Sequence, residues 1–487
     1  MSEVRVRIAP SPSGNLHIGT ARTALFNYLF AKKNNGKFIL RIEDTDAERT
    51  SQAYVDNIFD SLKALGLNWD EGPDIGGDFG PYIQSERLPM YKGYAEDLIK
   101  LGGAHYCFCS EEEIEAQRKE AESLGISFKF NDPCKHLSAE EVQAKLDAGE
   151  PYVIRQTIKD VGETYFDDEV YGRIEVDGDV LDEQILIKSD GYPTYNFANI
   201  IDDHQMQISH VVRGNEYLSS TPKYNLIYDA YGWQRPTYVH VPPVMKDEHH
   251  KLSKRNGDAS FQDLVAKGYL PEAIINYIAL LGWAPETEQE IYTLDELIKV
   301  FNIHRISKSP AIFDIDKLTW MNGVYLRNMD EETYYETVRP YLEKAVHGPY
   351  NLKEIAKIIQ PRIDILNQIE ESVDFFDTLV DYDLEMYRHK KMKTTPEVAL
   401  KALKASKQTL EAFDQWDSMD ALHECLLALP KELEMKNGQV LWPIRTAISG
   451  KQFTPGGAIE IAFILGKDET LRRIQVGIDR LSEIVEE

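Results

Sequence analysis

The sequence predicts an α/β protein in which a doubly wound parallel sheet carries an α+β insertion and is followed by an all-α C-terminal module. Three observations predict this class. Strand and helix periods alternate up to about residue 100, short polar strands and acidic turns fill residues 103–191, and helical periods dominate beyond Asp330. Since one domain contains about 150 residues, the 487 residues of the chain are expected to form several units.

A β-α-β unit is predicted at the N-terminus. Residues 4–8 alternate between apolar and charged side chains, residues 21–29 repeat apolar side chains with a helical period, and residues 38–42 alternate again. Such units build Rossmann-type sheets, whose ligands bind at the carboxyl ends of the strands, where helix N-termini also point. We therefore expect a ligand near the turn between the first strand and the first helix.

The C-terminal third carries the start and stop signals of helices. Thr395 is placed as an N-cap before Pro396, Ser418 is placed to cap the next helix, and Gly466 is placed to close another. Apolar residues between 471 and 484 keep helical spacing almost to the end of the chain.

Neither export nor membrane insertion is expected. The N-terminal residues lack the basic start and apolar core of a signal peptide, and the longest apolar stretch, around residues 273–283, is too short to span a bilayer. We therefore expect a cytoplasmic protein.

The net charge of −27 opposes nucleic-acid binding by the surface as a whole, because phosphate groups attract Lys and Arg. Only a local patch could bind, such as the RHKKMK string at residues 388–393, continued by Lys401, Lys404 and Lys407. An ordinary solvated helix face is the alternative interpretation.

The first motif that predicts chemistry lies at residues 7–20, between the first strand and the first helix. Its Pro/Gly turn brings backbone close to a ligand, and the following helix N-terminus offers N–H groups to phosphate. His17 is placed to donate to phosphate oxygens, and Gly19 leaves room for a nucleotide. A structural histidine is the alternative, since a single His-x-Gly is a weak signal.

A second motif, KLSKR at residues 251–255, lies in a polar loop after the strand at residues 238–241. Lys251 and Lys254 could swing onto a triphosphate and offset its charge in the transition state. A solvated basic loop is the alternative.

A third motif contains three of the four cysteines. Cys107 and Cys109 are followed by Cys134 and His136, a set of three thiolates and one imidazole that is typical of structural zinc. Free cysteines that pack as small hydrophobes are the alternative, which is also our interpretation of Cys425.

The first two motifs, in this order and about 230 residues apart, resemble the paired signatures of class I aminoacyl-tRNA synthetases. Thr20, Leu252 and Arg255 depart from the name-giving residues of those signatures, but such residues are usual in the glutamyl branch. Further strings resemble bacterial-type members of that branch: RIAPSPSG at 7–14, RIEDTD at 41–46, YPTYNFAN at 192–199, and RGNE at 213–216 with STP at 220–222. The cysteine spacing also matches a subset of this family.

The resemblance implies a complete set of site residues. Those for glutamate are Arg7, Ala9, Ser11, Glu43, Tyr195, Asn199 and Arg213. Those for ATP are His17, Gly19, Glu216, Val244, Met245 and Lys254, and the catalytic groups are His17, Lys251 and Lys254.

The charges of this set also suit glutamate. The amino acid carries two carboxylates and one ammonium, and Arg7, Arg213 and Glu43 form a complementary cage. Glutamine would leave a desolvated guanidinium without its anion, and such a site can reject the wrong analogue by about 10⁴–10⁵.

The implied function is ATP-dependent attachment of glutamate to tRNA(Glu) through glutamyl-adenylate, with Mg²⁺ accompanying ATP and one structural zinc ion. An enzyme that also charges tRNA(Gln) stays open, as does a catalytically inactive RNA-binding relative. The family is usually monomeric.

The resemblance and the changes in pattern together predict five segments. Residues 1–103 and 192–250 would form the two halves of the catalytic domain, and residues 104–191 an inserted acceptor-binding domain with the zinc site. Residues 251–330 would hold the Lys-x-Ser-Lys loop and a connecting helical domain, and residues 331–487 an all-helical anticodon-binding module. The QPR string at residues 360–362 lies where the family often reads the third anticodon base.

Overall fold

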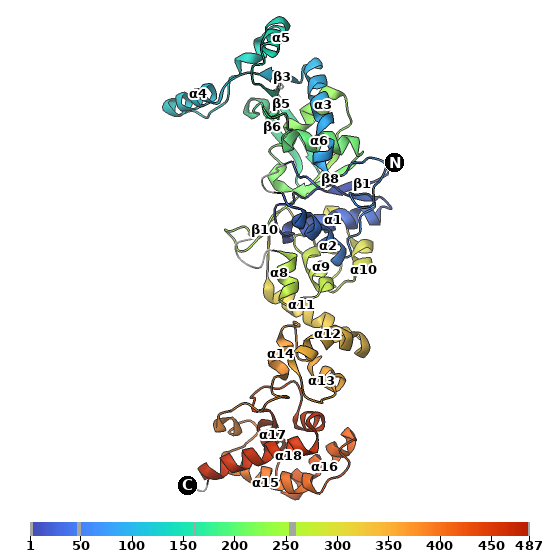
Figure 1. The fold of residues 1–487 in the computed structure, drawn as a ribbon, viewed down its shortest axis with the longest axis vertical. Coiled ribbons are helices and arrows are strands. Elements are labelled where there is room, and N and C mark those ends of the chain that lie inside the picture. Colours follow the sequence, from blue (N-terminus) through green and yellow to red (C-terminus); the bar gives the residue numbers. More distant parts are fainter. Residues whose placement is uncertain (1–2, 46–49, 160–161, 253–259, 486–487) are drawn as a thin grey trace. The chain divides into compact units, whose positions relative to one another are not determined.

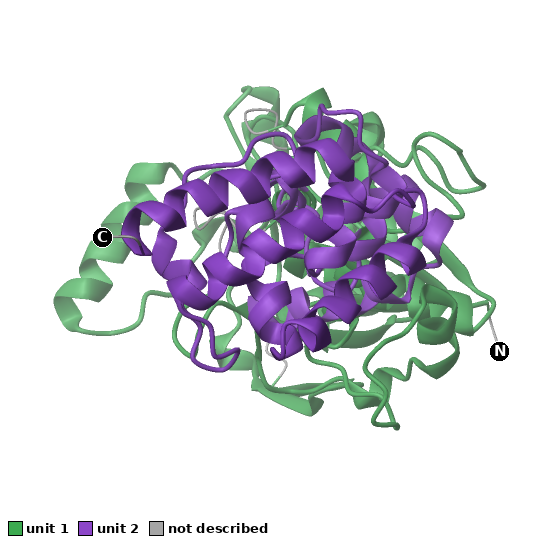
Figure 2. Cartoon of the chain, turned by 90° about the horizontal axis from the view of Figure 1, so that it is seen from below, with its two compact units in different colours: residues 1–265, 271–314 green, residues 266–270, 315–487 purple. Residues whose placement is uncertain are grey.

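The computed structural model describes residues 3–45, 50–159, 162–252 and 260–485, and it confirms the predicted fold class (Figure 1). The chain divides into two compact units, residues 1–265 with 271–314 and residues 266–270 with 315–487 (Figure 2). Among the described residues, unit 1 contains every strand and unit 2 is built from helices.

The predicted β-α-β unit forms the start of unit 1. Strand β1 (Arg5–Ile8) pairs in parallel with β2 (Lys37–Leu40), and helix α1 (Ile18–Lys33) connects them. The apolar repeat of α1 is buried against the sheet, while Lys32 and Lys33 lie in its last turn, where cations favour the helix dipole.

A second sheet continues beside β1. Strand β8 (His210–Gly214) lies next to β1, since Ser209 N donates to Arg5 O at 2.9 Å. From β8 the order runs in parallel to β9 (Thr237–Val241) and β5 (Glu163–Asp168), and then antiparallel to β6 (Gly172–Asp177). Strand β5, although it lies within the segment predicted as an insertion, therefore belongs to the same sheet as β8 and β9.

The rest of that segment forms a separate three-stranded antiparallel sheet, β3 (Ala104–Cys107), β4 (Val153–Gln156) and β7 (Ile185–Ile187). Helices α4 (Glu111–Leu124) and α5 (Ala139–Asp147) connect its first two strands. Both begin with a capping box, formed by Ser110 with Glu113 and by Ser138 with Glu141. Because α4 and α5 bury few side chains, these caps supply much of their local stability.

The remaining elements of unit 1 complete the layers around the sheets. They are α2 (Gln52–Ala64), α3 (Leu88–Lys100), α6 (Tyr195–Gln205), α7 (Thr221–Tyr231), β10 (Val244–Met245), α9 (Pro271–Ala279), α10 (Leu294–Val300) and β11 (Ala311–Ile312). Helix α8 (Phe261–Ala266) ends where the chain first enters unit 2.

Unit 2 confirms the predicted helical C-terminal third. Its helices are α11 (Ile315–Asn328), α12 (Glu331–Ala345), α13 (Leu352–Ile359), α14 (Gln368–Val373), α15 (Pro396–Glu411), α16 (Met419–Glu432), α17 (Asn437–Ser449) and α18 (Ala458–Val485). The predicted caps form, because Thr395 accepts from Val398 N and Ser418 accepts from Ala421 N. At Gly466 the backbone has a φ of 76°, so α18 is kinked at the position where a helix end was expected.

No helix in the described parts of the chain combines the length and the apolar character needed to cross a membrane.

Candidate active site

A cavity of about 560 Å³ opens where β1, β8 and β9 end, in front of the N-terminus of α1. The predicted residues Arg7, Ala9, Ser11, His17, Gly19, Glu43, Tyr195, Arg213, Glu216, Val244 and Lys251 all line it. Asn199 lies just behind this lining and donates to the Tyr195 carbonyl oxygen at 2.6 Å. Met245 follows Val244 in β10, and Lys254 lies outside the described residues.

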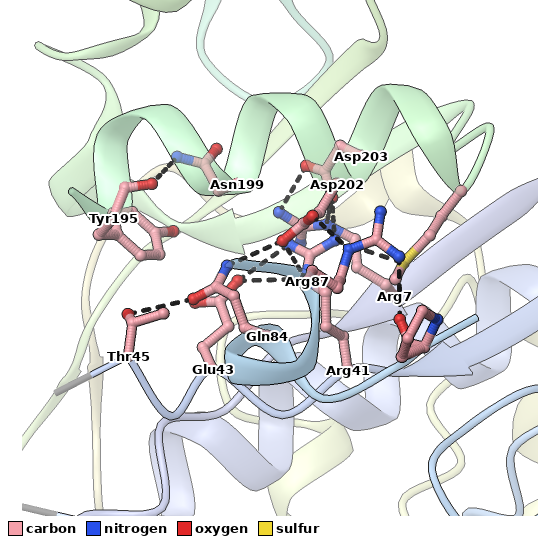
Figure 3. A network of polar contacts seen from close by, with 12 residues as sticks. Arg7, Arg41, Glu43, Thr45, Gln84, Arg87, Tyr195, Asn199, Asp202 and Asp203 are labelled. Carbon is pink, nitrogen blue, oxygen red and sulfur yellow. Dashed lines mark hydrogen bonds and ion pairs between the residues drawn. The ribbon is translucent and has the colours of Figure 1, made fainter. Parts of the chain in front are cut away.

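Arg7 and Arg41 share one buried carboxylate, that of Asp203 (Figure 3). Arg7 donates to both oxygens of Asp203, at 2.9 and 3.1 Å, and Arg41 Nη1 donates to Asp203 Oδ1 at 2.7 Å. Burial raises the pKa of Asp203, but the two guanidiniums outweigh it and the pKa lies below its ordinary value. The positive charge of Arg7 is therefore largely balanced by the protein.

Arg41 holds Glu43 through one of its two carboxylate oxygens. Arg41 Nη2 donates to Glu43 Oε1 at 2.9 Å, and Arg41 Nε reaches the same oxygen at 3.3 Å. Glu43 also lines the cavity, and no described residue donates a hydrogen bond to its other oxygen, Oε2.

A second buried carboxylate, Asp202, fixes helix α6, which also carries Asp203. It accepts from Gln84 Nε2 at 2.8 Å and from Arg87 Nε at 2.7 Å (Figure 3). It also accepts from the Tyr91 hydroxyl at 2.8 Å. The sequence analysis missed Asp202 and Asp203. The available signal was an acidic pair directly after the apolar residues of α6, which burial makes costly unless the pair has cationic partners.

Arg213, at the end of β8, is anchored by neutral groups. Its Nε donates to His240 Nε2 at 3.1 Å and its Nη2 donates to Thr221 Oγ1 at 2.8 Å. The guanidinium carbon lies 4.9 Å from the ring centre of Tyr217 and 5.0 Å from that of Tyr224. Within the described residues no carboxylate forms an ion pair with Arg213, so its charge is available to a ligand.

The first two sequence motifs meet at the same cavity. His17 precedes α1, and its Nδ1 accepts from Gly19 N at 3.0 Å. Its Nε2 lies 3.2 Å from the carbonyl oxygen of Leu252, which can only accept, so Nε2 carries the proton. Lys251 and Leu252 are held by β10, where Leu252 N donates to Val244 O at 3.2 Å.

The three predicted cysteines also lie together, in the insertion. The sulfur atoms of Cys107, Cys109 and Cys134 and one carboxylate oxygen of Asp132 all lie within 4.8 Å of one another. Burial, with the Asp132 carboxylate nearby, raises the pKa of the Cys107 thiol to about 11. Three sulfurs and one oxygen form a donor set that fits zinc.

His136 lies at the end of the 3-10 helix Pro133–His136 and is exposed, and the cluster in the described residues does not include it. Its role as fourth ligand stays a prediction. Asp132 was missed, although its position two residues before Cys134 and its carboxylate suit a metal site.

The comparison with known families identifies both parts of the chain. The family described as "tRNA synthetases class I (E and Q), catalytic domain" matches residues 3–320. The chain belongs to this family. The family described as "Anticodon binding domain" matches residues 333–478 of the synthetase.

Similar proteins agree over the full length of the synthetase. The chain is 56% identical over 483 residues to a glutamate–tRNA ligase of Clostridium botulinum strain Hall, and the match covers 99% of each chain. It is 55% identical over 483 residues to the Clostridium acetobutylicum glutamate–tRNA ligase, again with 99% of each chain covered.

A solved structure shares this fold. The crystal structure of a glutamate tRNA ligase from Elizabethkingia meningosepticum, in complex with its amino acid, has a TM-score of 0.90 and 35% sequence identity to this chain. The match covers 99% of this chain and 100% of that one.

Proposed function

We propose that this synthetase is a glutamate–tRNA ligase. It activates L-glutamate with ATP to glutamyl-adenylate and pyrophosphate, and then transfers glutamate to the 3′-terminal ribose of tRNA(Glu). The observation that carries this proposal is the single cavity that is lined by Arg213 and Glu43 as well as by His17 and Lys251.

The part of the cavity around Arg213 and Glu43 suits glutamate. Arg213 offers a cation that the protein leaves unbalanced, and Glu43 Oε2 offers an anion to the substrate ammonium. Arg7 contributes hydrogen-bond donors, while Asp203 balances most of its charge. The full glutamate set is Arg7, Ala9, Ser11, Glu43, Tyr195, Asn199 and Arg213.

The part of the cavity around His17 and Lys251 suits ATP. The N-terminus of α1 lies at the cavity and can offer N–H groups to phosphates. Gly19 lines the cavity without a side chain, and a Cβ there would lie 3.2 Å from His17 Nδ1 and crowd the imidazole. Glu216 would accept from the ribose, and the backbone of Val244 and Met245 would hold the adenine. Mg²⁺ accompanies ATP, and Lys251 and Lys254 offset phosphate charge.

Two transfers follow from this arrangement. The glutamate α-carboxylate attacks the α-phosphorus of ATP, a P–O bond to the β-phosphate breaks, and pyrophosphate leaves with its electron pair. A terminal ribose hydroxyl of tRNA then attacks the adenylate carbonyl, AMP leaves, and the hydroxyl proton passes to a phosphate oxygen or to solvent. The protein supplies positioning and charge stabilisation, by His17 at the phosphate and Arg213 at the substrate.

The other segments have proposed roles in tRNA binding. Residues 104–191 form the acceptor-binding insertion with one structural zinc ion, and residues 331–487 form the anticodon-binding module. Residues 1–103 and 192–250 form the catalytic domain, and residues 251–330 connect the two. We further propose a cytoplasmic monomer that could charge tRNA(Gln) in addition to tRNA(Glu).

The test is ATP-dependent charging of labelled glutamate onto separate tRNA(Glu) and tRNA(Gln) transcripts. Charging of tRNA(Glu) alone supports the proposal with strict tRNA discrimination, and charging of both supports its non-discriminating form. No ATP-dependent charging of either would contradict the proposal and favour the inactive RNA-binding alternative.

A further inference from the structure

The anchor of Arg213 is itself part of a buried chain of hydrogen bonds that runs away from the cavity. His240, on β9, has no exposed surface and presents Nε2 to Arg213 at 3.1 Å. Its other ring nitrogen, Nδ1, lies 2.7 Å from Asp168 Oδ2, and Asp168 is also buried. The chain of contacts is therefore Asp168, His240, Arg213 and then the substrate position.

Asp168 is fixed by backbone groups as well as by the imidazole. Its Oδ2 accepts from His240 N at 3.0 Å, and its Oδ1 accepts from Val170 N at 3.0 Å and from Tyr171 N at 2.8 Å. Three backbone N–H groups thus point at the two oxygens of this carboxylate, and both oxygens act as acceptors.

These contacts define the protonation state of the imidazole. Asp168 Oδ2, which already accepts from His240 N, also accepts from the imidazole, so the His240 proton lies on Nδ1. Arg213 has only donors, so Nε2 must offer a lone pair. Neutral His240 with its proton on Nδ1 satisfies both neighbours, whereas a protonated ring would place an N–H against the Arg213 Nε–H.

We propose that Asp168 and His240 are positioning residues that hold Arg213, uncompensated, where it recognises a carboxylate of glutamate. The inference rests on the proposed function. A carboxylate in place of His240 would anchor Arg213 but neutralise it, as Asp203 does for Arg7. A neutral imidazole anchors Arg213 and leaves its full charge for the substrate, which is what distinguishes glutamate from glutamine.

The charged and titratable groups that face His240 are Asp168 on β5, Arg213 on β8, Glu216 in the following turn and Tyr238 on its own strand. Burial lowers the pKa of His240 below its ordinary value of about 6.5, although Asp168 opposes this shift. The neutral form is therefore favoured above the folded-state pKa. As the pH falls through that pKa, the anchor of Arg213 is lost and the KM for glutamate rises.

Two variants of His240 separate its two contacts. In H240N the side-chain amide nitrogen takes the position of the imidazole Nδ1. The variant therefore keeps a donor for Asp168 but has no acceptor for Arg213. Gln places its carbonyl oxygen near Nε2, so H240Q keeps that acceptor without a titrating ring. H347N, at an exposed histidine of unit 2, is the control.

Steady-state charging with tRNA(Glu) is the first measurement. We expect H240N to raise the KM for glutamate about 10-fold or more, the scale of a lost hydrogen bond to a charged group, with little change in the KM for ATP. H240Q should recover most of this loss and should lack the rise of KM at low pH. Equal changes in both KM values for H240N, or no change, would contradict the positioning role.

The tautomer can be measured on the wild-type protein, with H240Q used only to assign the signal. Nitrogen-15 NMR of histidine-labelled full-length protein at pH 7.5 should show a neutral His240 ring with its proton on Nδ1, assigned by its absence from the H240Q spectrum. A protonated ring or a proton on Nε2 would overturn the proposal, even if H240N failed to fold. Wild-type protein that charges no glutamate would instead overturn the proposed function.

Discussion

Charge balance at single residues determines what the cavity can recognise. Arg7 and Arg213 are both buried arginines that line the cavity, but Asp203 pairs with Arg7 and only neutral atoms anchor Arg213. Glu43 is the anion of the same cavity, with Oε1 bound to Arg41. These differences lead to two predictions at the scale of single side chains.

The first concerns Glu43. E43Q keeps the shape of the side chain but removes the charge that would face the substrate ammonium. We expect the KM for glutamate to rise by about 10-fold or more, because a hydrogen bond to a charged group contributes about 1.5–3 kcal/mol. The KM for ATP should hardly change in the same charging assay.

The matched control for E43Q is E71Q. Glu71 is also a buried glutamate paired with an arginine, since Arg5 Nη1 donates to its Oε1 at 2.7 Å, but it lies outside the cavity. E71Q should lower stability and leave the KM for glutamate unchanged. The same rise of KM in both variants would show that lost ion pairing, and not substrate contact, explains the effect of E43Q.

The second prediction concerns Asp203. D203N leaves Arg7 and Arg41 without their shared anion, and breaking a buried ion pair costs about 3–5 kcal/mol. The pKa of Asp203 in the folded protein lies below its ordinary value of about 3.9. Its contribution to the free energy of unfolding is therefore complete above about pH 3.9, and it is lost only as the pH falls through the folded-state pKa.

Urea unfolding at pH 7 and pH 5 measures this contribution. The difference in unfolding free energy between wild type and D203N should be the same at both pH values, and it should shrink only below about pH 3.9. A difference that already disappears at pH 5 would mean that Asp203 is protonated there, contrary to the arrangement of the two guanidiniums.

At the scale of elements, helix α1 places both a cap and a reactive group at its first turn. His17 Nδ1 accepts from Gly19 N, so the imidazole is a structural cap as well as the proposed phosphate donor. Asn is a good N-cap but carries no imidazole N–H at the Nε2 position. H17N therefore tests the chemical role while it preserves the cap.

We expect H17N to lower the rate of glutamyl-adenylate formation, with tRNA present, by about 10²-fold, the scale for removal of one charge-stabilising donor. The midpoint of thermal unfolding should change little. Near-wild-type rates would contradict the role of His17 at the phosphate.

The cysteine cluster joins β3 to the 3-10 helix Pro133–His136. Elemental analysis of reduced protein should find about one zinc per chain, according to the donor set. D132A and H136A form a matched pair for the fourth ligand. Since Asp132 lies with the sulfurs, D132A should lose zinc on dialysis and H136A should retain it.

The opposite result, with zinc lost only from H136A, would restore the ligand set that the sequence spacing predicts. Absence of zinc from freshly purified, reduced wild-type protein would remove the site altogether. Cys425, which is separate from the cluster, serves as a control through C425S.

At the scale of the whole molecule, the sequence predicts local elements and motifs well. The β-α-β unit, the caps at Thr395 and Ser418, and the helical C-terminal third follow from periods and capping residues, which act over a few neighbours. The family resemblance predicts that His17 and Lys251 lie close together, although they are far apart in the sequence. Both residues line the cavity.

Long-range pairs could not be predicted in the same way. Asp168 meets His240 only because β5 lies beside β9, and neither residue belongs to a motif of its own. Asp203 meets Arg7 and Arg41 because α6 lies against β1 and the segment after β2. Sheet order and helix placement decide these contacts, and periodicity along the chain does not report them.

The most direct test of the central claim is amino-acid specificity on one tRNA. The wild-type synthetase is given labelled glutamate, glutamine or aspartate with ATP, Mg²⁺ and a tRNA(Glu) transcript, and charged tRNA is counted. We predict ATP-dependent charging by glutamate and negligible charging by the other two, because glutamine has no side-chain carboxylate for the uncompensated Arg213 and the side chain of aspartate is one methylene shorter. Charging by glutamine at a rate similar to that of glutamate would contradict this account.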